Sequence, residues 1–450
     1  MSFPAYPAYK DSGVDWLGEI PEGWSIKPLW ALFRRHKLTG FPDEQLLSVY
    51  RDYGVIPKAS RDDNFNKPSD DLGAYQLVQV GDLVINKMKA WQGSVGIASY
   101  KGIVSPAYHV YAPGHSEAPQ YLHHLFRCNE YIAGYLANSK GIRVNQWDLE
   151  PQQHSRMSVL LPSFQEQTQI ARFLDHETAR IDALIEEQQR LIELLKEKRQ
   201  AVISHAVTKG LDPTVPMKDS GVEWLGEVPA HWGVSKLKFI TDRVVDCPHE
   251  TPNYNPDGNY LVIRTADLDQ GILKPEQMYR LDKDEYVRRT RRSSLEMNDV
   301  VYGREGERWG HAALVPESDL YALGQRMMQF RVSDQVCPEY FMFQLNSIAV
   351  YGQGEVDTVG ATSPHVNIST IINFQMMIPP QEEQARISNY LNKTLRNLDS
   401  LINESADAMG LLQERRSALI SAAVTGKVDV RGWQPPTSTQ APELLVAEAV

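Results

Sequence analysis

Side chains that can pair with the edges of nucleotide bases gather in two stretches of this sequence. The first is Asn86-Lys-Met-Lys-Ala-Trp-Gln92, and the second, 217 positions later, is Gly303-Arg-Glu-Gly-Glu-Arg-Trp309. Arg and Lys offer donors that match guanine, and the amides of Asn and Gln match adenine. A lone loop lysine or arginine is usually only solvated. The prediction therefore depends on two stretches that share a position along the chain but differ in chemistry.

Further basic and amide residues follow each stretch. The predicted nucleic-acid contacts are Lys87, Lys89, Trp91, Gln92, Arg143, Asn145 and Gln146 in the first half, and Arg304, Arg308, Arg326, His365 and Asn367 in the second. The most basic spot is Arg288-Arg-Thr-Arg-Arg292. It is interpreted either as a phosphate clamp or as a solvated helix face that pairs with Asp282, Asp284 and Glu285.

Motifs of catalysis are missing from the sequence. No Asn/Asp-Pro-Pro-aromatic motif of an adenine methyltransferase occurs, because Asn255-Pro256 and Asp212-Pro213 each lack the second proline. There is no Gly-x-x-x-x-Gly-Lys-Ser/Thr phosphate loop, and no Glu stands two residues before a Lys as in metal-dependent nucleases. His123-His124 is more typical of packing than of a metal site. We therefore expect no catalytic centre, no metal and no cofactor in this chain.

The elements that must position these loops include two long helices. From 165 to 208, apolar residues recur at alternating steps of four and three, the period with which a helix keeps one seam against a partner. The same pattern returns 217 positions later. The predicted seam residues, which would contact a partner helix, are Ile170, Leu174, Leu184, Leu191 and Leu195, and then Ile387, Leu391, Leu398, Leu401 and Leu412. At about 1.5 Å per residue, each helix would span about 60 Å. Helices of this length cannot bury their apolar faces inside small globular domains. Because both have the same seam pattern, they are expected to pair with each other.

A second repeat indicates a duplicated architecture. Residues 10–24, Lys-Asp-Ser-Gly-Val-Asp-Trp-Leu-Gly-Glu-Ile-Pro-Glu-Gly-Trp, return with few changes at 218–232. Turn-forming glycines beside large apolar side chains are typical of a packing clasp. Each clasp precedes a mixed α/β stretch, with strands expected at 81–85 and 298–302 and at 93–98 and 310–315, and with short helices opening at Pro119 and Pro338.

The fold is therefore expected to be α/β (α+β), with two globular domains in tandem pseudo-repeat and two long helices. The expected divisions are 1–160 for the first domain, 161–217 for a central helical spacer, 218–378 for the second domain, 379–430 for a second helical spacer and 431–450 for a disordered tail.

The composition is that of an ordinary globular protein, with 42% hydrophobic and 23% charged residues. No apolar run is long enough for a membrane span, no signal peptide is visible, and three separated cysteines indicate reduced thiols, so a cytoplasmic location is expected. The net charge of −11 argues against a protein that binds nucleic acid unaided.

This plan resembles the specificity (S) subunit of type I restriction–modification systems, a class that acts in phage defence. The resemblance rests on the two clasps, on the segments around Gly81-Asp82 and Asn298-Asp299, and on the Glu-Gln openings of both helices, and it covers nearly all of residues 10–430. It implies two target recognition domains that each read one half of a bipartite, asymmetric site on double-stranded DNA.

The resemblance further implies an antiparallel coiled coil that sets the spacing and docks two methylation (M) subunits. Those subunits bind S-adenosylmethionine and methylate adenine, and restriction (R) subunits complete the complex; the S subunit itself has no catalytic centre. Two other readings of the sequence remain open. One is a coiled-coil adaptor that binds proteins. The other is a fused methyltransferase–nuclease, which the missing motifs oppose.

Overall fold

The computed structural model describes residues 3–51, 53–61, 67–69, 71–141, 147–222, 225–306, 308–356 and 365–436. The chain divides into two compact units. The first comprises Met1–Gln188 and Asp407–Val450, and the second comprises Gln189–Ala406. The long helices α4 (Phe164–Lys209) and α9 (Gln381–Val424) each contribute one half to each unit.

The first unit is built from short strands and three short helices within its described residues. The strands are β1 (Tyr9–Asp11), β2 (Glu19–Pro21), β3 (Ser25–Pro28), β4 (Phe33–His36), β5 (Leu47–Tyr50), β6 (Gly54–Pro57), β7 (Gln76–Val78), β8 (Leu83–Asn86), β9 (Val95–Ile97), β10 (Gly102–Val104), β11 (Tyr108–Pro113), β12 (Ser139–Lys140), β13 (Asp148–Leu149) and β14 (Ser158–Leu161). The helices are α1 (Pro119–Leu125), α2 (Asn129–Ala137) and α3 (Pro151–Arg156). An antiparallel sheet in the order β4-β11-β8-β9 forms the centre, and β3–β14, β5–β6 and β7–β10 form shorter antiparallel pairs.

The second unit repeats this plan with additions. Its strands are β15 (Met217–Asp219), β16 (Glu227–Pro229), β17 (Gly233–Lys236), β18 (Thr241–Asp246), β19 (Tyr260–Ile263), β20 (Leu268–Asp269), β21 (Ile272–Leu273), β22 (Tyr279–Leu281), β23 (Val300–Gly303), β24 (Ala312–Leu314), β25 (Tyr321–Leu323), β26 (Met327–Val332) and β27 (Gln375–Ile378). Its helices are α5 (Lys283–Thr290), α6 (Pro338–Leu345), α7 (Ile348–Glu355) and α8 (Ile368–Ile371).

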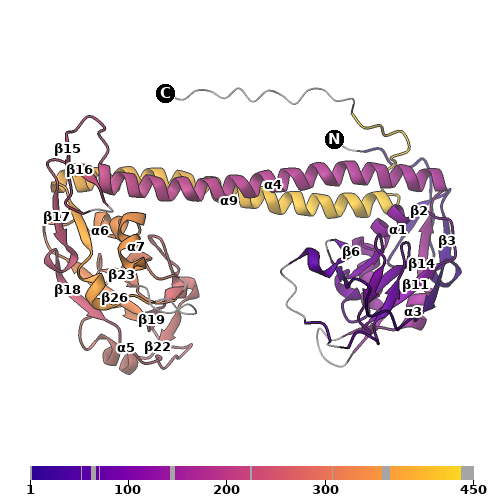
Figure 1. Ribbon diagram of the computed structural model, residues 1–450, viewed down its shortest axis with the longest axis horizontal. Helices are drawn as coiled ribbons and strands as arrows, with labels where there is room; N and C mark the ends of the chain where they lie inside the picture. Colours follow the sequence, from indigo (N-terminus) through magenta and orange to yellow (C-terminus); the bar gives the residue numbers. More distant parts are fainter. Residues whose placement is uncertain are drawn as a thin grey trace. The chain divides into compact units, whose positions relative to one another are not determined.

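The two central sheets correspond strand by strand. The order β18-β26-β23-β24 in the second unit matches β4-β11-β8-β9 in the first, so the strands and short helices predicted at equivalent positions are confirmed. The units differ where their sequences differ. The second has a β22-β19-β25 sheet and helix α5, whereas the first has the β5–β6 and β7–β10 pairs. Figure 1 shows α6 and α7 on the side of the β23–β26 sheet that faces the long helices, where they share one apolar core with them.

The clasps are hairpins that close each core. β1 pairs with β2 and β15 pairs with β16, both antiparallel, and the tryptophans that follow, Trp24 and Trp232, are 2% and 1% exposed. Their predicted packing role is confirmed. The chain after α9 also packs on the first unit, because Trp433 lies edge-on to Phe173 with ring centroids 5.3 Å apart. The part of the predicted disordered tail from 437 onward lies outside the described residues.

The long helices run antiparallel within each unit. In the first unit, Arg416 of α9 donates to Asp182 of α4. The side-chain amide of Gln169, which precedes Asp182 on α4, donates to the carbonyl of Val430, which follows Arg416 in the chain. In the second unit, Arg199 bonds Asp399. α4 and α9 therefore form the coiled coil that the repeated pattern predicted.

The seam of this pair differs from the predicted one at three of the ten predicted residues. Ile170, Leu174, Leu195, Ile387, Leu391 and Leu398 are at most 9% exposed, and Leu412 is partly buried. Leu184, Leu191 and Leu401 are 42%, 42% and 47% exposed, so placing these three in the seam was wrong.

The physical reason lies in the residue that follows each of them. Ile185, Ile192 and Ile402 come directly after the three exposed leucines, and all three are less exposed, with Ile192 at 7%. A heptad can begin with its step of three or its step of four, and both orders give the same mean period of 3.5. Because the sequence offers Leu-Ile at each ambiguous step, hydrophobicity alone could not decide the order.

Candidate nucleic-acid interface

The loop predicted to contact nucleic acid in the first unit lies between β8 and β9. Two backbone hydrogen bonds of Lys87, here called the frame of the loop, hold its start in place. The amide of Lys87 donates to the carbonyl of Ala107 at 3.3 Å, and the carbonyl of Lys87 accepts from Leu149 at 3.0 Å. The loop then forms a short 3₁₀ turn over Ala90–Gln92 and ends at Gly93, whose φ of +88° glycine tolerates best.

The loop of the second unit is held by the equivalent two backbone hydrogen bonds, made by Arg304. The amide of Arg304 donates to the carbonyl of Arg326 at 3.0 Å, and the carbonyl of Arg304 accepts from Val366 at 3.1 Å. Gly310, with φ of +87°, ends it as Gly93 ends the first loop. The structure therefore brings together Arg304, Arg326 and His365, which the sequence had predicted separately, since an isolated bridge joins His365 to Glu305.

In the first unit the loop borders a hollow of about 660 Å³. Its lining combines three lysines, two amides and several apolar or hydroxyl side chains, and none of it is acidic: Leu46, Leu47, Ser48, Lys58, Lys67, Pro68, Tyr75, Asn86, Met88, Lys89, Trp91, Gln92, Ser105, Ala107 and Tyr108. Positive charge, amides and a tryptophan are features that suit the binding of a nucleic-acid strand. This part of the surface therefore suits nucleic acid although the net charge of the whole chain is negative.

The predicted residues of this loop have different surroundings. Lys89 and Gln92 are exposed. Lys87 forms an ion pair with Asp148 at 3.0 Å, and Trp91 lies edge-on to Trp147 with centroids 4.9 Å apart. Lys89 and Gln92 can therefore reach a ligand directly, while Lys87 and Trp91 also support the loop.

In the second unit, a charged network surrounds the first residues of the loop. The Nε of Arg304 donates to Asp246 at 3.1 Å, and its Nη2 lies 2.9 Å from Glu305. Asp246 also pairs with His249 at 2.8 Å, and Glu305 lies 3.5 Å from the Nε of Arg326. Arg304 is 7% exposed, so it holds the loop in place.

Arg326 is an exposed arginine of this network. About half of its side chain, 49%, is exposed, and its only ion pair among the described residues is the long one to Glu305. Its φ is +70°, a region that costs most non-glycine residues roughly 1 kcal/mol or more, and its amide donates to the sulfur of Cys247 at 3.1 Å. The backbone thus holds Arg326 in a fixed, unusual position with its guanidinium toward solvent.

The remaining predicted contacts are distributed differently. Arg308 donates to the carbonyls of Ala266 and Leu268, both at 3.0 Å, which ties its loop to the neighbouring turn. Asn367 is exposed and precedes α8. Arg143, Asn145 and Gln146 lie outside the described residues.

Buried histidines lie behind the first loop. Nδ1 of His109 on β11 lies 3.1 Å from an Nη of Arg35, and Nδ1 of His154 on α3 lies 3.2 Å from the hydroxyl of Tyr111. Burial, and then the charge of Arg35, lowers the pKa of His109 to about 4. Burial, assisted by His109, lowers the pKa of His154 to about 3. Both rings are therefore neutral at pH 7.

The aspartates before β8 and β23 are structural. Asp82 and Asp299, each 2% exposed, accept the amides of Gln79 and Glu296 respectively, both at 2.8 Å. Burial raises the pKa of Asp82, against the opposing effects of the Gln79 amide and of His36. Asp299 also accepts two hydrogen bonds from Arg331. These residues fix the turn that leads into each loop.

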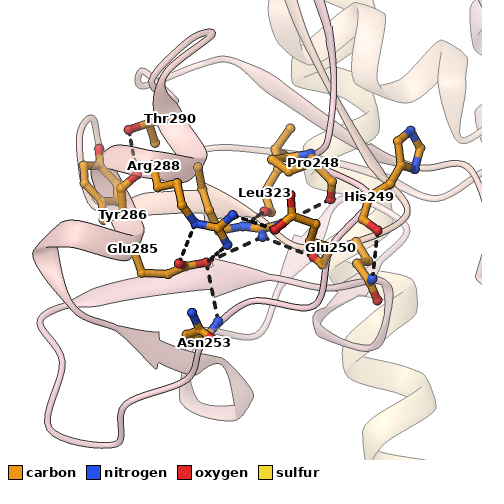
Figure 2. A network of polar contacts seen from close by, with 11 residues as sticks. Pro248, His249, Glu250, Asn253, Glu285, Tyr286, Arg288, Thr290 and Leu323 are labelled. Carbon is orange, nitrogen blue, oxygen red and sulfur yellow. Dashed lines mark hydrogen bonds and ion pairs between the residues drawn. The ribbon is translucent and has the colours of Figure 1, made fainter.

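The basic run at 288–292 is divided between two environments. Arg288 pairs with Glu285 at 2.8 Å and with Glu250 at 2.6 Å (Figure 2). Arg289 donates to the carbonyls of Leu323, Glu250 and Pro248. The interpretation as a paired helix face thus holds for these two arginines through Glu285. Arg291 and Arg292 are exposed.

The sequence also pointed to Lys58 and Lys67 as basic residues upstream of the first loop, and both line the hollow. Sequence reasoning did not identify the anchors of Arg304, which are Asp246 and Glu305. In the part of the chain that the structure describes, no group of three or more metal-ligating side chains occurs. No described helix has both the length and the apolar character to cross a bilayer.

Comparison with known proteins gives this architecture a family context. Residues 237–407 match the family model described as "Type I restriction modification DNA specificity domain". The putative type I restriction enzyme MjaX specificity subunit of Methanocaldococcus jannaschii is 22% identical over 92% of this chain and 96% of its own length. The StySPI specificity subunit of Salmonella potsdam is also 22% identical, over 93% of this chain and 91% of its own.

Solved structures agree in fold. A chain from a study of complex assembly and conformational transition in the type I R-M system aligns with a TM-score of 0.66 at 16% identity, covering 90% of this chain and 98% of that one. The HsdS subunit of Thermoanaerobacter tengcongensis aligns with a TM-score of 0.51 at 17% identity, covering 91% and 98%. These names agree with the expectation of a non-catalytic subunit. The chain is therefore similar over most of its length to type I restriction enzyme specificity subunits, and its residues 237–407 match the DNA specificity domain of type I restriction–modification systems.

Proposed function

We propose that this chain is the DNA-recognition subunit of a type I restriction–modification complex and that each unit reads one half of a bipartite, asymmetric DNA site. The observation that carries the proposal is the shared frame of the two loops. The same two backbone hydrogen bonds hold Lys87 in one unit and Arg304 in the other, yet the side chains around them differ. Two readers of different half-sites require this combination of one scaffold and two chemistries.

The two units would read DNA in different ways. In the first, Lys58, Lys67 and Lys89 would contact phosphates, while Asn86 and Gln92 would offer amides to base edges. In the second, the exposed guanidinium of Arg326 would donate to a guanine edge, with Arg304 as its support.

The paired helices would set the distance between the half-sites and dock two methylation subunits. The exposed leucines Leu184, Leu191 and Leu401 supply apolar surface outside the seam, which a partner subunit could cover. The methylation subunits would bind S-adenosylmethionine and methylate adenine, and restriction subunits would join them to cleave.

The negative net charge of the chain supports a model in which this chain and the methylation subunits share the contacts to DNA phosphates. Affinity for DNA that does not depend on sequence comes from phosphates neutralised by the protein. With a net charge of −11, this chain would supply only local positive surface, so the methylation subunits would supply the rest. Tight, specific binding by the isolated chain at physiological salt would contradict this account.

The test is methylome sequencing of a host that expresses the chain with its methylation subunit. A bipartite adenine-methylated motif is expected. Gln92→Ala should relax the motif in one half only, and Arg326→Ala in the other half only, because the two residues lie in different units. Arg172→Ala, an exposed arginine on α4, serves as the control and should leave the motif unchanged. A motif that changes in both halves with either loop variant, or no bipartite motif at all, would refute the proposal.

A further inference from the structure

An exposed histidine of the second unit lies next to Arg326, outside the contacts considered so far. His249 belongs to the segment 246–250, here called the strap, which begins at the last residue of β18. Its side chain is 64% exposed. The question is what this imidazole can contact.

Three hydrogen bonds join the strap to the segment that carries Arg326. The amide of Cys247 donates to the carbonyl of Met327, and the amide of Arg326 donates to the sulfur of Cys247, both at 3.1 Å. The side-chain amide of Gln325 donates to the carbonyl of His249 at 3.4 Å. These bonds continue the pairing of β18 with β26 beyond the ends of the strands, so His249 lies beside Arg326.

A buried arginine fixes the strap from the other side. Arg289, 5% exposed, donates to the carbonyl of Leu323 at 2.8 Å and to the carbonyls of Glu250 and Pro248 at 3.2 and 3.4 Å. Both neighbours of His249 in the chain are therefore tied to the end of β25. Figure 2 shows the ring of His249 pointing away from these bonds. The backbone is thus held in place, while the ring extends from it.

His249 and Arg326 are the two exposed ends of one side-chain network. Oδ2 of Asp246 lies 2.8 Å from Nε2 of His249, and Oδ1 of Asp246 accepts from Nε of Arg304 at 3.1 Å. Arg304 in turn lies 2.9 Å from Glu305, which lies 3.5 Å from Arg326. The side chains of Asp246 and Arg304 are only 13% and 8% exposed. A mostly buried interior therefore orients both ends.

Asp246 determines which nitrogen of the His249 ring can accept a hydrogen bond. An ionised carboxylate only accepts, so Nε2, at 2.8 Å from it, must carry the proton. In a neutral imidazole the other nitrogen is then an acceptor. Among the residues that the structure describes, none forms a hydrogen bond or an ion pair with Nδ1. Nδ1 therefore presents an acceptor at the surface beside Arg326.

DNA offers few partners to an acceptor. Phosphate oxygens only accept, and the sugars within a DNA strand have no hydroxyl group. In the major groove, the donors are the exocyclic amino groups of adenine and cytosine. A guanidinium such as that of Arg326 matches guanine instead. His249 and Arg326 thus suit two different base edges.

The strap also lies where the two units differ. The repeat of the clasps places Phe33, the first residue of β4, at the position of Thr241, the first residue of β18. β4 has four residues and β18 has six, so β18 continues for two residues beyond the equivalent of the end of β4. The strap follows from this extension. Structure that distinguishes two readers on one scaffold is where different specificities are expected.

We propose that Nδ1 of His249 accepts a hydrogen bond from the exocyclic amino group of an adenine or a cytosine, next to the guanine that Arg326 contacts in the half-site of the second unit. This rests on the proposed function. His249 is then a specificity-determining residue, and it requires a base of the opposite hydrogen-bonding character to the one that Arg326 requires.

The first test is methylome sequencing of hosts that express variants of the chain with its methylation subunit. His249→Ala should relax one position of the second unit's half-site and leave the other half unchanged. His249→Lys, which offers only donors, should shift the preference at that position toward guanine or thymine. His231→Ala is the matched control, because His231 is also an exposed histidine of this unit and pairs with a carboxylate, Glu383, at 2.7 Å, but in the clasp. It should leave the motif unchanged.

The second test removes the amino group from the DNA. Duplexes carry purine in place of adenine, or 2-pyrimidinone in place of cytosine, at the position that His249→Ala relaxes. The complex of the wild-type chain with its methylation subunit should bind them about fivefold more weakly than natural DNA. The His249→Ala complex should bind natural DNA about fivefold more weakly and lose nothing further with the altered base.

The outcomes separate this inference from the proposed function. If Arg326→Ala relaxed one half-site while His249→Ala left every position as it was, His249 would not read a base. Weaker binding without a relaxed position would mean that the strap only supports the fold. A wild-type preference for guanine or thymine at the relaxed position would show that the ring donates, and would overturn the proposal. If the wild-type complex methylated no bipartite site, the proposed function would fail instead.

Discussion

The Nε of Arg199 lies 3.0 Å from Oδ1 of Asp399, and both residues have counterparts 217 positions away that form the same bond: Nε of Arg416 lies 2.7 Å from Oδ1 of Asp182. Each unit thus contains one arginine–aspartate pair across the coiled coil. The repeat preserves both partners of the bond, in addition to the apolar pattern. Two antiparallel helices with one such pair in each half have a defined register, since sliding either helix would separate both pairs.

The two pairs should differ in strength. The Arg199 side chain is 11% exposed and donates also to Gln270, whereas the Arg416 side chain is 31% exposed. We expect Arg199→Ala to lower the free energy of unfolding by about 2–3 kcal/mol and Arg416→Ala by about 1 kcal/mol. Urea denaturation measures both. Exchanging the partners, with Arg416→Asp and Asp182→Arg together, should restore most of the smaller loss. Equal losses in the two single variants would contradict this reading.

The corrected seam predicts opposite results at adjacent residues. Leu191 is 42% exposed and Ile192 is 7% exposed. Leu191→Gln should change the free energy of unfolding of the isolated chain by no more than about 0.5 kcal/mol, while Ile192→Ala should cost about 2–4 kcal/mol because it leaves a cavity in the seam. If the Leu191 variant were the less stable one in urea, the originally predicted seam would be the right one.

Acid should weaken the first unit through its buried histidines. Because folding lowers the pKa of His154 to about 3 and of His109 to about 4, below the value of about 6.5 in the unfolded chain, the unfolded state binds more protons between these values. The stability that they contribute is complete above pH 6.5 and declines as the pH falls toward 4, by about 1.4 kcal/mol per pH unit for each histidine.

His154→Gln should therefore flatten the dependence of unfolding free energy on pH between 6.5 and 4. His205→Gln, at an exposed position on α4, is the matched control and should leave the dependence as it is. Denaturation at a series of pH values checks both. A wild-type curve that is no steeper than that of His154→Gln would mean that the buried ring titrates normally.

The coiled coil should act as a spacer. Seven residues inserted into α4 after Gln188 and seven into α9 after Ser405 keep the heptad seam and add about 10 Å of helix. The methylated motif should then gain about three base pairs between its halves, at about 3.4 Å per pair, while each half keeps its sequence. An insertion in α4 alone should disrupt pairing and abolish methylation. Half-site sequences that change while the gap stays constant would disprove the spacer role.

The repeats in the sequence predicted the duplicated architecture because repetition is a property of the chain itself. The matches at 10–24 and 218–232 and the 217-residue offset of the long helices required no knowledge of contacts. The seam was predicted correctly at Leu195 and wrongly at Leu191, because adjacent leucine and isoleucine satisfy the same period and only the packed partner distinguishes them.

The candidate site was predictable only in its frame. Equal spacing placed Lys87 and Arg304 at matching positions, and the structure gives both the same backbone bonds. The partners of Arg304 could not be predicted, since Asp246 lies 58 residues away and is brought close by strand pairing. Likewise, Arg288 and Arg289 looked available for DNA, but Glu285, only three or four residues earlier, and carbonyls from other loops engage them.

The amide of Asp429 donates to the carbonyl of Pro4 at 2.8 Å, so the first unit is joined from both ends of the polypeptide. Its core includes Val428 and Val430 beside Trp24. During synthesis, the second unit has all its residues once the ribosome passes position 406, whereas the first, although begun earlier, waits for the final turns of α9 and the residues beyond. The order in which the units can be completed is therefore the reverse of the order in which they are begun.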